Sequence, residues 1–178
     1  MNFYRPRFNI ILSVLAALAL ACGCATDKEK AEKHLAALRL HIESSANTGT
    51  SGQTITVLRD QPVSVTIATE PVLTEANIVA ATLLETPGGY AVEIKFDETG
   101  GWILVQQSAA NPGKHFAVFG QWGEKLKDSR WLAAPQISHR IVGGVLAFTP
   151  DCSRDEAKEL VLGLNNVAKK VAKGAMKL

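Results

Sequence analysis

Apolar and polar residues alternate in three short runs of this chain, which is the pattern of strands that bury one face. Two of these runs lie within residues 54–68, on either side of the turn-forming Arg59–Pro62. The third, Tyr90–Phe96, follows the extended run Ile78–Thr86 after the turn residues Pro87-Gly88-Gly89. The sequence therefore predicts two β-hairpins, of which the second has the cleaner alternation.

Shorter segments complete the predicted sheet. Leu73–Asn77 is predicted to form one helical turn before the second hairpin, and Gly120–Arg130 is predicted to be a polar loop that holds Trp122. Three further strands are predicted at His115–Phe119, Ile137–Val142 and Val145–Phe148.

Apolar residues spaced three and four apart predict two helices among these strands. The first runs through Gly101–Ala110 with Asp97 as a candidate N-cap, and Trp102 lies on its apolar face. The second begins at the capping box Ser153–Glu156 and ends at Gly174.

A further helix is predicted over Asp27–Ala46, followed by the flexible connector Asn47–Gln53. Its narrow apolar stripe consists of Ala31, Leu35, Leu38 and Ile42. We therefore expect residues 24–53 to be a tether helix and linker, and residues 54–173 to be one folded domain. This domain is predicted to be α+β, with two helices packed on one face of a mostly antiparallel sheet.

The N-terminus has the parts of an export signal. Arg5 and Arg7 form a basic head, and the apolar run Ile10–Ala21 follows with Ser13 as its one polar residue. As a helix, this run would be about 18 Å long at 1.5 Å per residue. It is therefore too short to span the roughly 30 Å hydrocarbon core of a bilayer.

Two cysteines stand where this signal ends, among small residues. Cys24 follows Gly23, and Cys22 follows Ala21. A cysteine at the cleavage point resembles a bacterial lipoprotein signal, in which that cysteine carries lipid. We expect residues 1–23 to be the signal and Cys24 to be lipidated, with Cys22 as the alternative. The resemblance implies an exported protein, held by a lipid anchor at a membrane of the cell envelope and facing the periplasm.

The charge of the chain adds little to these predictions. Without Arg5 and Arg7, the chain has 17 basic and 17 acidic residues, so its net charge falls from +2 to zero. This balance gives no electrostatic case for nucleic-acid binding. Lysines gather at the end of the chain, at Lys169, Lys170, Lys173 and Lys177, where they complement a helix dipole or contact lipid headgroups.

The titratable residues form no pattern typical of an enzyme or a metal site. His34 and His41 lie seven residues apart in the predicted N-terminal helix without a third ligand, and we expect them to face solvent. Cys152 stands alone and is expected to be a small buried residue. The serines lack a nucleophile-elbow motif, and the glycine pairs lack a phosphate-loop pattern. We expect no enzymatic activity, no metal and no cofactor.

Trp122, Arg130 and Trp131 form the one cluster that is typical of binding sites, because Trp and Arg are enriched at interfaces. Burial in the core is the alternative for both tryptophans. We predict that Gln121–Arg130 forms a lip that binds a protein or peptide partner.

Four local matches, in order along the chain, resemble the head subdomain of the first periplasmic domain of SecD and SecDF, accessory subunits of the bacterial protein-export channel. The first has the family's Leu-Thr-x-x-x-Ile pattern, and the last has its Phe-Thr strand end and Glu-Ala helix start. The matches are Leu73–Ile78, Val92–Ala109, Trp131–Ile137 and Gly143–Leu164.

This resemblance implies a fold and an envelope setting. SecD and SecDF also carry membrane helices that couple proton flow to head movement, and this sequence contains no run of about 20 apolar residues. We therefore expect a lipid-anchored, non-catalytic protein whose head-like domain binds protein or peptide partners. The alternatives are an envelope enzyme with an unrecognised site, and an accessory factor in protein export or envelope assembly.

Overall fold

The computed structural model describes residues 34–44 and 52–175. The predicted signal and both candidate lipidated cysteines lie outside the described residues. So do most of the predicted connector and Lys177. The strands are β1 (Ala37–Ile42), β2 (Gly52–Val57), β3 (Val63–Ala68), β4 (Leu73–Thr74), β5 (Ile78–Thr86), β6 (Gly89–Phe96), β7 (Phe116–Trp122), β8 (Asp128–Ala133) and β9 (Val145–Phe148). The helices are the 3-10 turns η1 (Glu75–Asn77) and η2 (Glu124–Leu126), and the α-helices α3 (Glu98–Ala110) and α4 (Arg154–Ala175).

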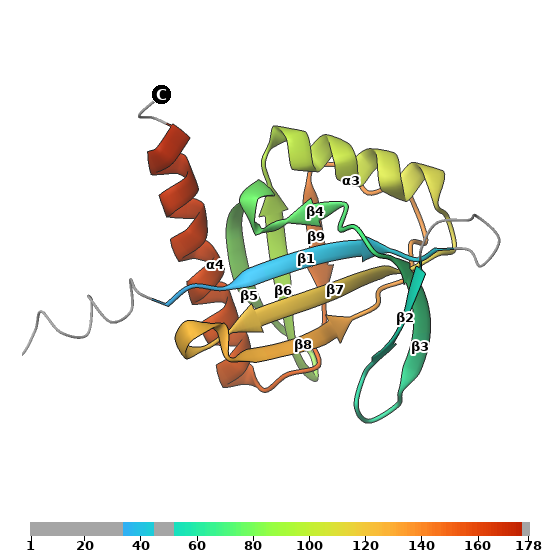
Figure 1. Ribbon diagram of the computed structural model, residues 1–178, viewed down its shortest axis with the longest axis horizontal. Coiled ribbons are helices and arrows are strands. Elements are labelled where there is room, and N and C mark those ends of the chain that lie inside the picture. Colours follow the sequence, from blue (N-terminus) through green and yellow to red (C-terminus); the bar gives the residue numbers. More distant parts are fainter. Residues whose placement is uncertain (1–33, 45–51, 176–178) are drawn as a thin grey trace, which may run out of the picture. The chain divides into compact units, whose positions relative to one another are not determined.

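The strands divide among three antiparallel sheets, where the sequence predicted one. A four-stranded sheet has the order β4-β1-β7-β8, a three-stranded sheet has the order β5-β6-β9, and β2 and β3 form a separate hairpin. Figure 1 shows the strands of the two larger sheets running across one another. Helix α4 lies beside β5, and α3 lies across one end of β6. The α+β class and the two helices predicted among the strands are confirmed.

The main core lies where the inner faces of the two larger sheets and the two helices meet. Leu38, Val118 and Ile94 come from β1, β7 and β6 and are at most 1% exposed. Leu104 of α3 and Leu160 of α4 are fully buried in the same cluster. Because each sheet covers the apolar face of the other, neither needs a helix over its whole face.

The helix predicted over Asp27–Ala46 is wrong over Ala37–Ile42, which form strand β1 at the centre of the four-stranded sheet. Every residue of β1 pairs with β7, from Ala37 opposite Gln121 to Ile42 opposite Phe116. Leu38 and Ile42 fit a helical stripe, but with Leu40 they also fit a strand with period two, so the spacing is ambiguous. The body therefore begins before residue 54, and the part of the predicted tether helix within 27–33 lies outside the described residues.

Both predicted hairpins are confirmed, and so are the predicted helix starts. β2 pairs with β3, and β5 pairs with β6. The Asp97 side chain caps α3 by accepting from the Gly100 N–H at 2.6 Å. The Ser153–Glu156 capping box is closed in both directions, because the Ser153 N–H donates to Glu156 Oε2 at 2.6 Å and the Glu156 N–H donates to Ser153 Oγ at 3.3 Å.

Two further predictions about local structure are wrong. Ile137–Val142 forms no strand; it passes over the end of α3, where the Ile141 N–H donates to Ser108 Oγ at 2.9 Å. The predicted loop Gly120–Arg130 instead contains the end of β7, the turn η2 and the start of β8. In α3, Trp102 is 63% exposed because the helix buries the face of Gly100, Leu104 and Ser108.

Candidate functional site

The β2–β3 hairpin packs on the four-stranded sheet through a second, smaller apolar cluster. Ile55 and Val57 of β2 are buried against Ala117 of β7. Val65 and Ile67 of β3 belong to the same cluster, and Trp131 and Ala134 pack against it. Ala117 alternates with the core residues of β7, so the hairpin covers the face of the sheet that points away from the main core.

One end of this hairpin is fixed by hydrogen bonds to β1. The Ser44 N–H donates to the Thr66 carbonyl at 2.8 Å, and His41 Nδ1 lies 2.9 Å from the Ala68 carbonyl oxygen. His41 is 7% exposed, so the prediction that it faces solvent is wrong. Its ring stacks edge-on against Trp131, with 5.4 Å between the ring centroids. These contacts hold the open end of the hairpin, where β3 ends. They do not hold the turn between β2 and β3 at the other end.

An open groove of about 530 Å³ lies between this turn and the ends of β8 and β9. Its lining is mixed, with slightly more apolar than polar residues. The apolar residues are Leu58, Ala133, Ala134, Pro135, Phe148 and Pro150. The polar residues are Arg59, Asp60, Gln61, Thr149 and Asp151. Leu58 directly follows β2 and has a left-handed φ of 67°, so the backbone turns sharply at the rim of the groove.

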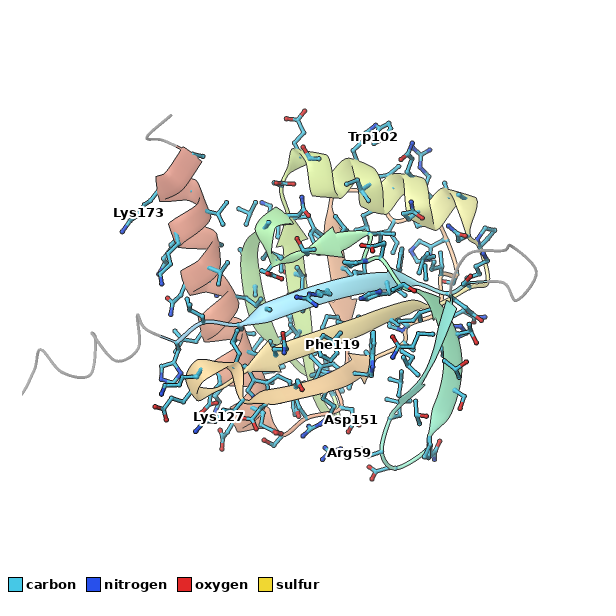
Figure 2. All side chains as sticks on the ribbon, viewed as in Figure 1. Arg59, Trp102, Phe119, Lys127, Asp151 and Lys173 are labelled. Atoms are coloured by element: carbon cyan, nitrogen blue, oxygen red, sulfur yellow. The ribbon has the colours of Figure 1, made fainter. Side chains whose placement is uncertain are left out.

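Arg59 and Asp151 connect the two sides of the groove. The Arg59 backbone N–H donates to Asp151 Oδ2 at 2.9 Å, and Arg59 Nε donates to Asp151 Oδ1 at 3.0 Å. Figure 2 shows these two side chains meeting below the four-stranded sheet. The hydrogen bond that Arg59 donates to Asp151, and the negative charge of that carboxylate, raise the pKa of Arg59. Because the Arg59 side chain is 60% exposed, solvent screens this pair and it contributes little to global stability.

Trp122 lies in the core, which is the alternative that the sequence analysis left open. It is 1% exposed at the end of β7, and within the described part of the chain its Nε1 has no hydrogen-bond partner. The Arg130 guanidinium lies 5.5 Å from the centroid of the Trp122 ring. Arg130 also donates to the Asp151 carbonyl at 3.0 Å and to Glu156 Oε1 at 3.4 Å. Arg130 therefore fixes the segment that forms one wall of the groove.

Trp131 is half-buried beside the groove. On the outward face of the sheet its ring lies against Phe119, with 5.1 Å between the ring centroids. Trp131 also packs against the hairpin cluster together with Ala134, which lines the groove. Of the three predicted partner-binding residues, Arg130 and Trp131 therefore support the groove, while Trp122 lies inside the core.

The sequence analysis missed Arg59 and Asp151, which are 92 residues apart in the chain. It placed Arg59 in the turn of the first hairpin, and Asp151 falls between the predicted strand Val145–Phe148 and the helix that begins at Ser153. No pattern in the sequence connects them, because the fold alone brings the turn after β2 to the end of β9.

Two titratable groups near the groove have raised pKa values. Burial, followed by the charge of Glu156, raises the pKa of the Cys152 thiol to about 11. The Tyr90 hydroxyl donates to the Cys152 carbonyl, and burial raises the pKa of Tyr90 as well. In residues 34–44 and 52–175, no three His, Cys, Asp or Glu side chains gather as metal ligands. What the groove offers is backbone and apolar surface next to one exposed ion pair.

Comparison with known protein families identifies the family of this chain. The family model described as "SecDF, P1 head subdomain" matches residues 52–168. The chain belongs to this SecDF head family. Its matched region contains both hairpins, α3, the part of α4 up to Ala168 and every residue of the groove, whereas β1 lies outside it. Among curated proteins, none matches the chain.

Solved SecDF structures share the head fold. One, of SecDF in a super-membrane-facing form, aligns with a TM-score of 0.53 at 21% identity and covers 78% of this chain. Another is described as a membrane component SecDF that enhances protein export, and it aligns with a TM-score of 0.53 at 20% identity over 82% of this chain. The chain spans 20% of the length of the first and 70% of the second. None of the helices described here is long and apolar enough to cross a bilayer.

Proposed function

We propose that this protein is a non-catalytic, lipid-anchored component of the cell envelope whose SecDF-head domain binds an extended segment of a protein partner. The observation that carries this proposal is the groove at the end of β2, a strand with one unpaired edge. Within the described residues, β2 pairs only with β3, so its other edge carries unpaired backbone groups. β2 ends at Val57, and the next residue, Leu58, lines the groove.

The groove and the unpaired edge of β2 have the chemical groups that bind an extended peptide. An unpaired strand edge offers backbone hydrogen bonds to any added strand, whatever its side chains. The apolar lining at Ala134, Pro135 and Phe148 offers contacts to alternate side chains of that strand. The polar rim at Gln61 and Thr149 stays available to water.

The family supports a role near protein export. A SecDF structure of similar fold is described as enhancing protein export. We therefore propose that the bound partner is a protein that is being exported or assembled in the envelope. We further propose that lipid on Cys24, or on Cys22, holds the domain at the membrane. If so, the double variant Cys22→Ala/Cys24→Ala leaves the membrane fraction, and its continued retention there would contradict the anchor.

Crosslinking in cells tests the groove. A photo-crosslinking amino acid at Gln61 is expected to capture exported proteins, while the same probe at the exposed Trp102 on α3 is not. Thr149→Arg places a long charged side chain in the groove and is expected to lower capture at least about fivefold. Thr82→Arg on β5 is the matched control, since Thr82 is also an exposed threonine but lies outside the groove. Equal capture from both probe positions, or equal loss in both arginine variants, would contradict the proposal.

A further inference from the structure

The C-terminal end of α4 projects beyond the part of the helix that packs on the body. The last buried residue of α4 is Ala168, and every residue from Lys169 to Ala175 is exposed. Figure 1 shows this end of the helix standing apart from the strands. Val171 is 43% exposed although it continues the helix face on which Leu164 is buried. Nearly two turns of helix therefore carry an apolar stripe without a packing partner in the described residues, and helices of this kind gain most of their stability from such packing.

This projecting end is also strongly basic. Between Leu160 and Ala175, α4 contains three lysines and no acidic residue. The lysines are Lys169, Lys170 and Lys173, all exposed. Acidic residues do occur on elements that contact α4, namely Glu75 on η1, Glu85 on β5 and Glu93 on β6. Glu85, however, is paired with Arg154 at the other end of the helix.

His34, the first residue that the structure describes, contacts the same helix. Asn166 Nδ2 donates to the His34 carbonyl at 2.9 Å. Gly163 allows this close approach, because a Cβ there would lie 2.7 Å from the Ala36 backbone nitrogen. The first described residue is therefore held one helical turn before Lys169 and Lys170. Nine residues lie between Cys24 and His34, and the ten steps along the chain span at most roughly 33–36 Å when fully extended.

We propose that the projecting end of α4, residues 169–175, lies on an anionic lipid surface and forms a second membrane contact of this protein. The inference rests on the proposed lipid anchor, because an anchor at Cys24 keeps His34, and with it the end of α4, within reach of the bilayer. Val171 enters the headgroup region, and the lysines pair with anionic headgroups. Each lysine near such a surface strengthens binding about fivefold, so three lysines together contribute roughly a hundredfold.

A fluorophore that reports on its surroundings tests this contact in the full chain. It is attached at Val171→Cys in a Cys22→Ser/Cys24→Ser background, so that no acyl chain contributes; buried Cys152 stays unlabelled. Its emission is expected to shift to the blue with mixed vesicles of phosphatidylcholine and anionic phosphatidylglycerol, and not with pure phosphatidylcholine. The same fluorophore at Trp102→Cys on α3 is expected not to shift with either vesicle.

Charge reversal provides the matched controls. The triple variant Lys169→Glu/Lys170→Glu/Lys173→Glu is expected to lose the shift, or to need at least about tenfold more lipid for it. Reversal of three exposed lysines elsewhere is expected to leave the shift intact: Lys95→Glu/Lys125→Glu/Lys127→Glu. Circular dichroism checks that both triple variants melt like the parent.

Three results would overturn the lipid contact. They are an equal shift on neutral vesicles, no shift on anionic vesicles, and a shielded fluorophore before lipid is added. The last would show that this chain's own N-terminal segment or a second copy covers Val171. Peptide capture from Gln61 is scored separately, so failure of the lipid contact leaves the proposed function standing.

Discussion

Two tryptophans show how far the role of a single residue depends on the fold. Trp122 is 1% exposed and Trp102 is 63% exposed, whereas the sequence placed Trp122 in a polar loop and Trp102 on an apolar helix face. Trp122 is buried because β7 continues beyond the predicted end at Phe119 and carries the tryptophan to the inner face of the sheet. The sequence did not reveal this burial, since the neighbours Gln121 and Gly123 occur as readily in a loop as at the end of a strand.

Cys152 leads to a prediction about pH. Its thiol pKa is about 11 in the folded protein because burial disfavours the thiolate. At pH 8, alkylation of Cys152 by iodoacetamide is therefore expected to be at least about 100-fold slower in the native protein than in urea, as followed by mass spectrometry. The unfolded chain loses this proton first, so the thiol stabilises the fold less as pH rises from about 9 to 11. Equal native and unfolded rates at pH 8 would show that Cys152 is accessible.

The elements that could be predicted from the sequence are those with an unambiguous local signal. The second strand of the 78–96 hairpin alternates and follows a turn of Pro and glycines, and the start of α4 has a capping box, so both were correctly predicted. β1 could not be distinguished from a helix, because its extended conformation depends on pairing with β7, which lies far along the chain. The groove was missed for the same reason, since Arg59 and Asp151 meet only through the tertiary fold.

The β2–β3 hairpin is expected to loosen when its contact with Asp151 is removed. Asp151→Ala eliminates both acceptors of Arg59, while the buried cluster around Ile55 and Val65 remains. Hydrogen exchange in residues 57–63 is expected to rise several-fold, and the free energy of unfolding to fall by less than about 1 kcal/mol, since the pair is exposed. Asp60→Ala at the same turn is the control and is expected to leave exchange unchanged. A large loss of global stability would mean that the ion pair is structural for the whole body.

The fold as a whole depends on a strand that the family match does not include. The SecDF head match covers residues 52–168, but β1 at 37–42 lies between β4 and β7 in the four-stranded sheet. Leu38 and Leu40 of β1 are at most 1% exposed and belong to the main core. The folded unit is therefore residues 34–175 of the described chain, and the matched region alone leaves a gap in the sheet.

Shortening the chain tests this boundary. A chain that begins at Gly52 lacks β1, which exposes the edge of β7 and uncovers the apolar core, so it is expected to aggregate or to lose its cooperative urea transition. A chain that begins at His34 keeps β1 and is expected to unfold in one cooperative step. The comparison uses far-ultraviolet circular dichroism and size-exclusion chromatography. A cooperative transition in the chain that begins at Gly52 would show that β1 is dispensable.

The position of β1 also determines when the protein finishes folding as it is made. β1 emerges early, but its long partner β7 follows only after every element from β2 to α3 has been synthesised. At synthesis rates of roughly 5–20 residues per second, β1 waits on the order of 4–17 seconds for that partner. The sheet therefore closes late, and a nascent chain carries an uncovered strand that is open to aggregation until β7 arrives.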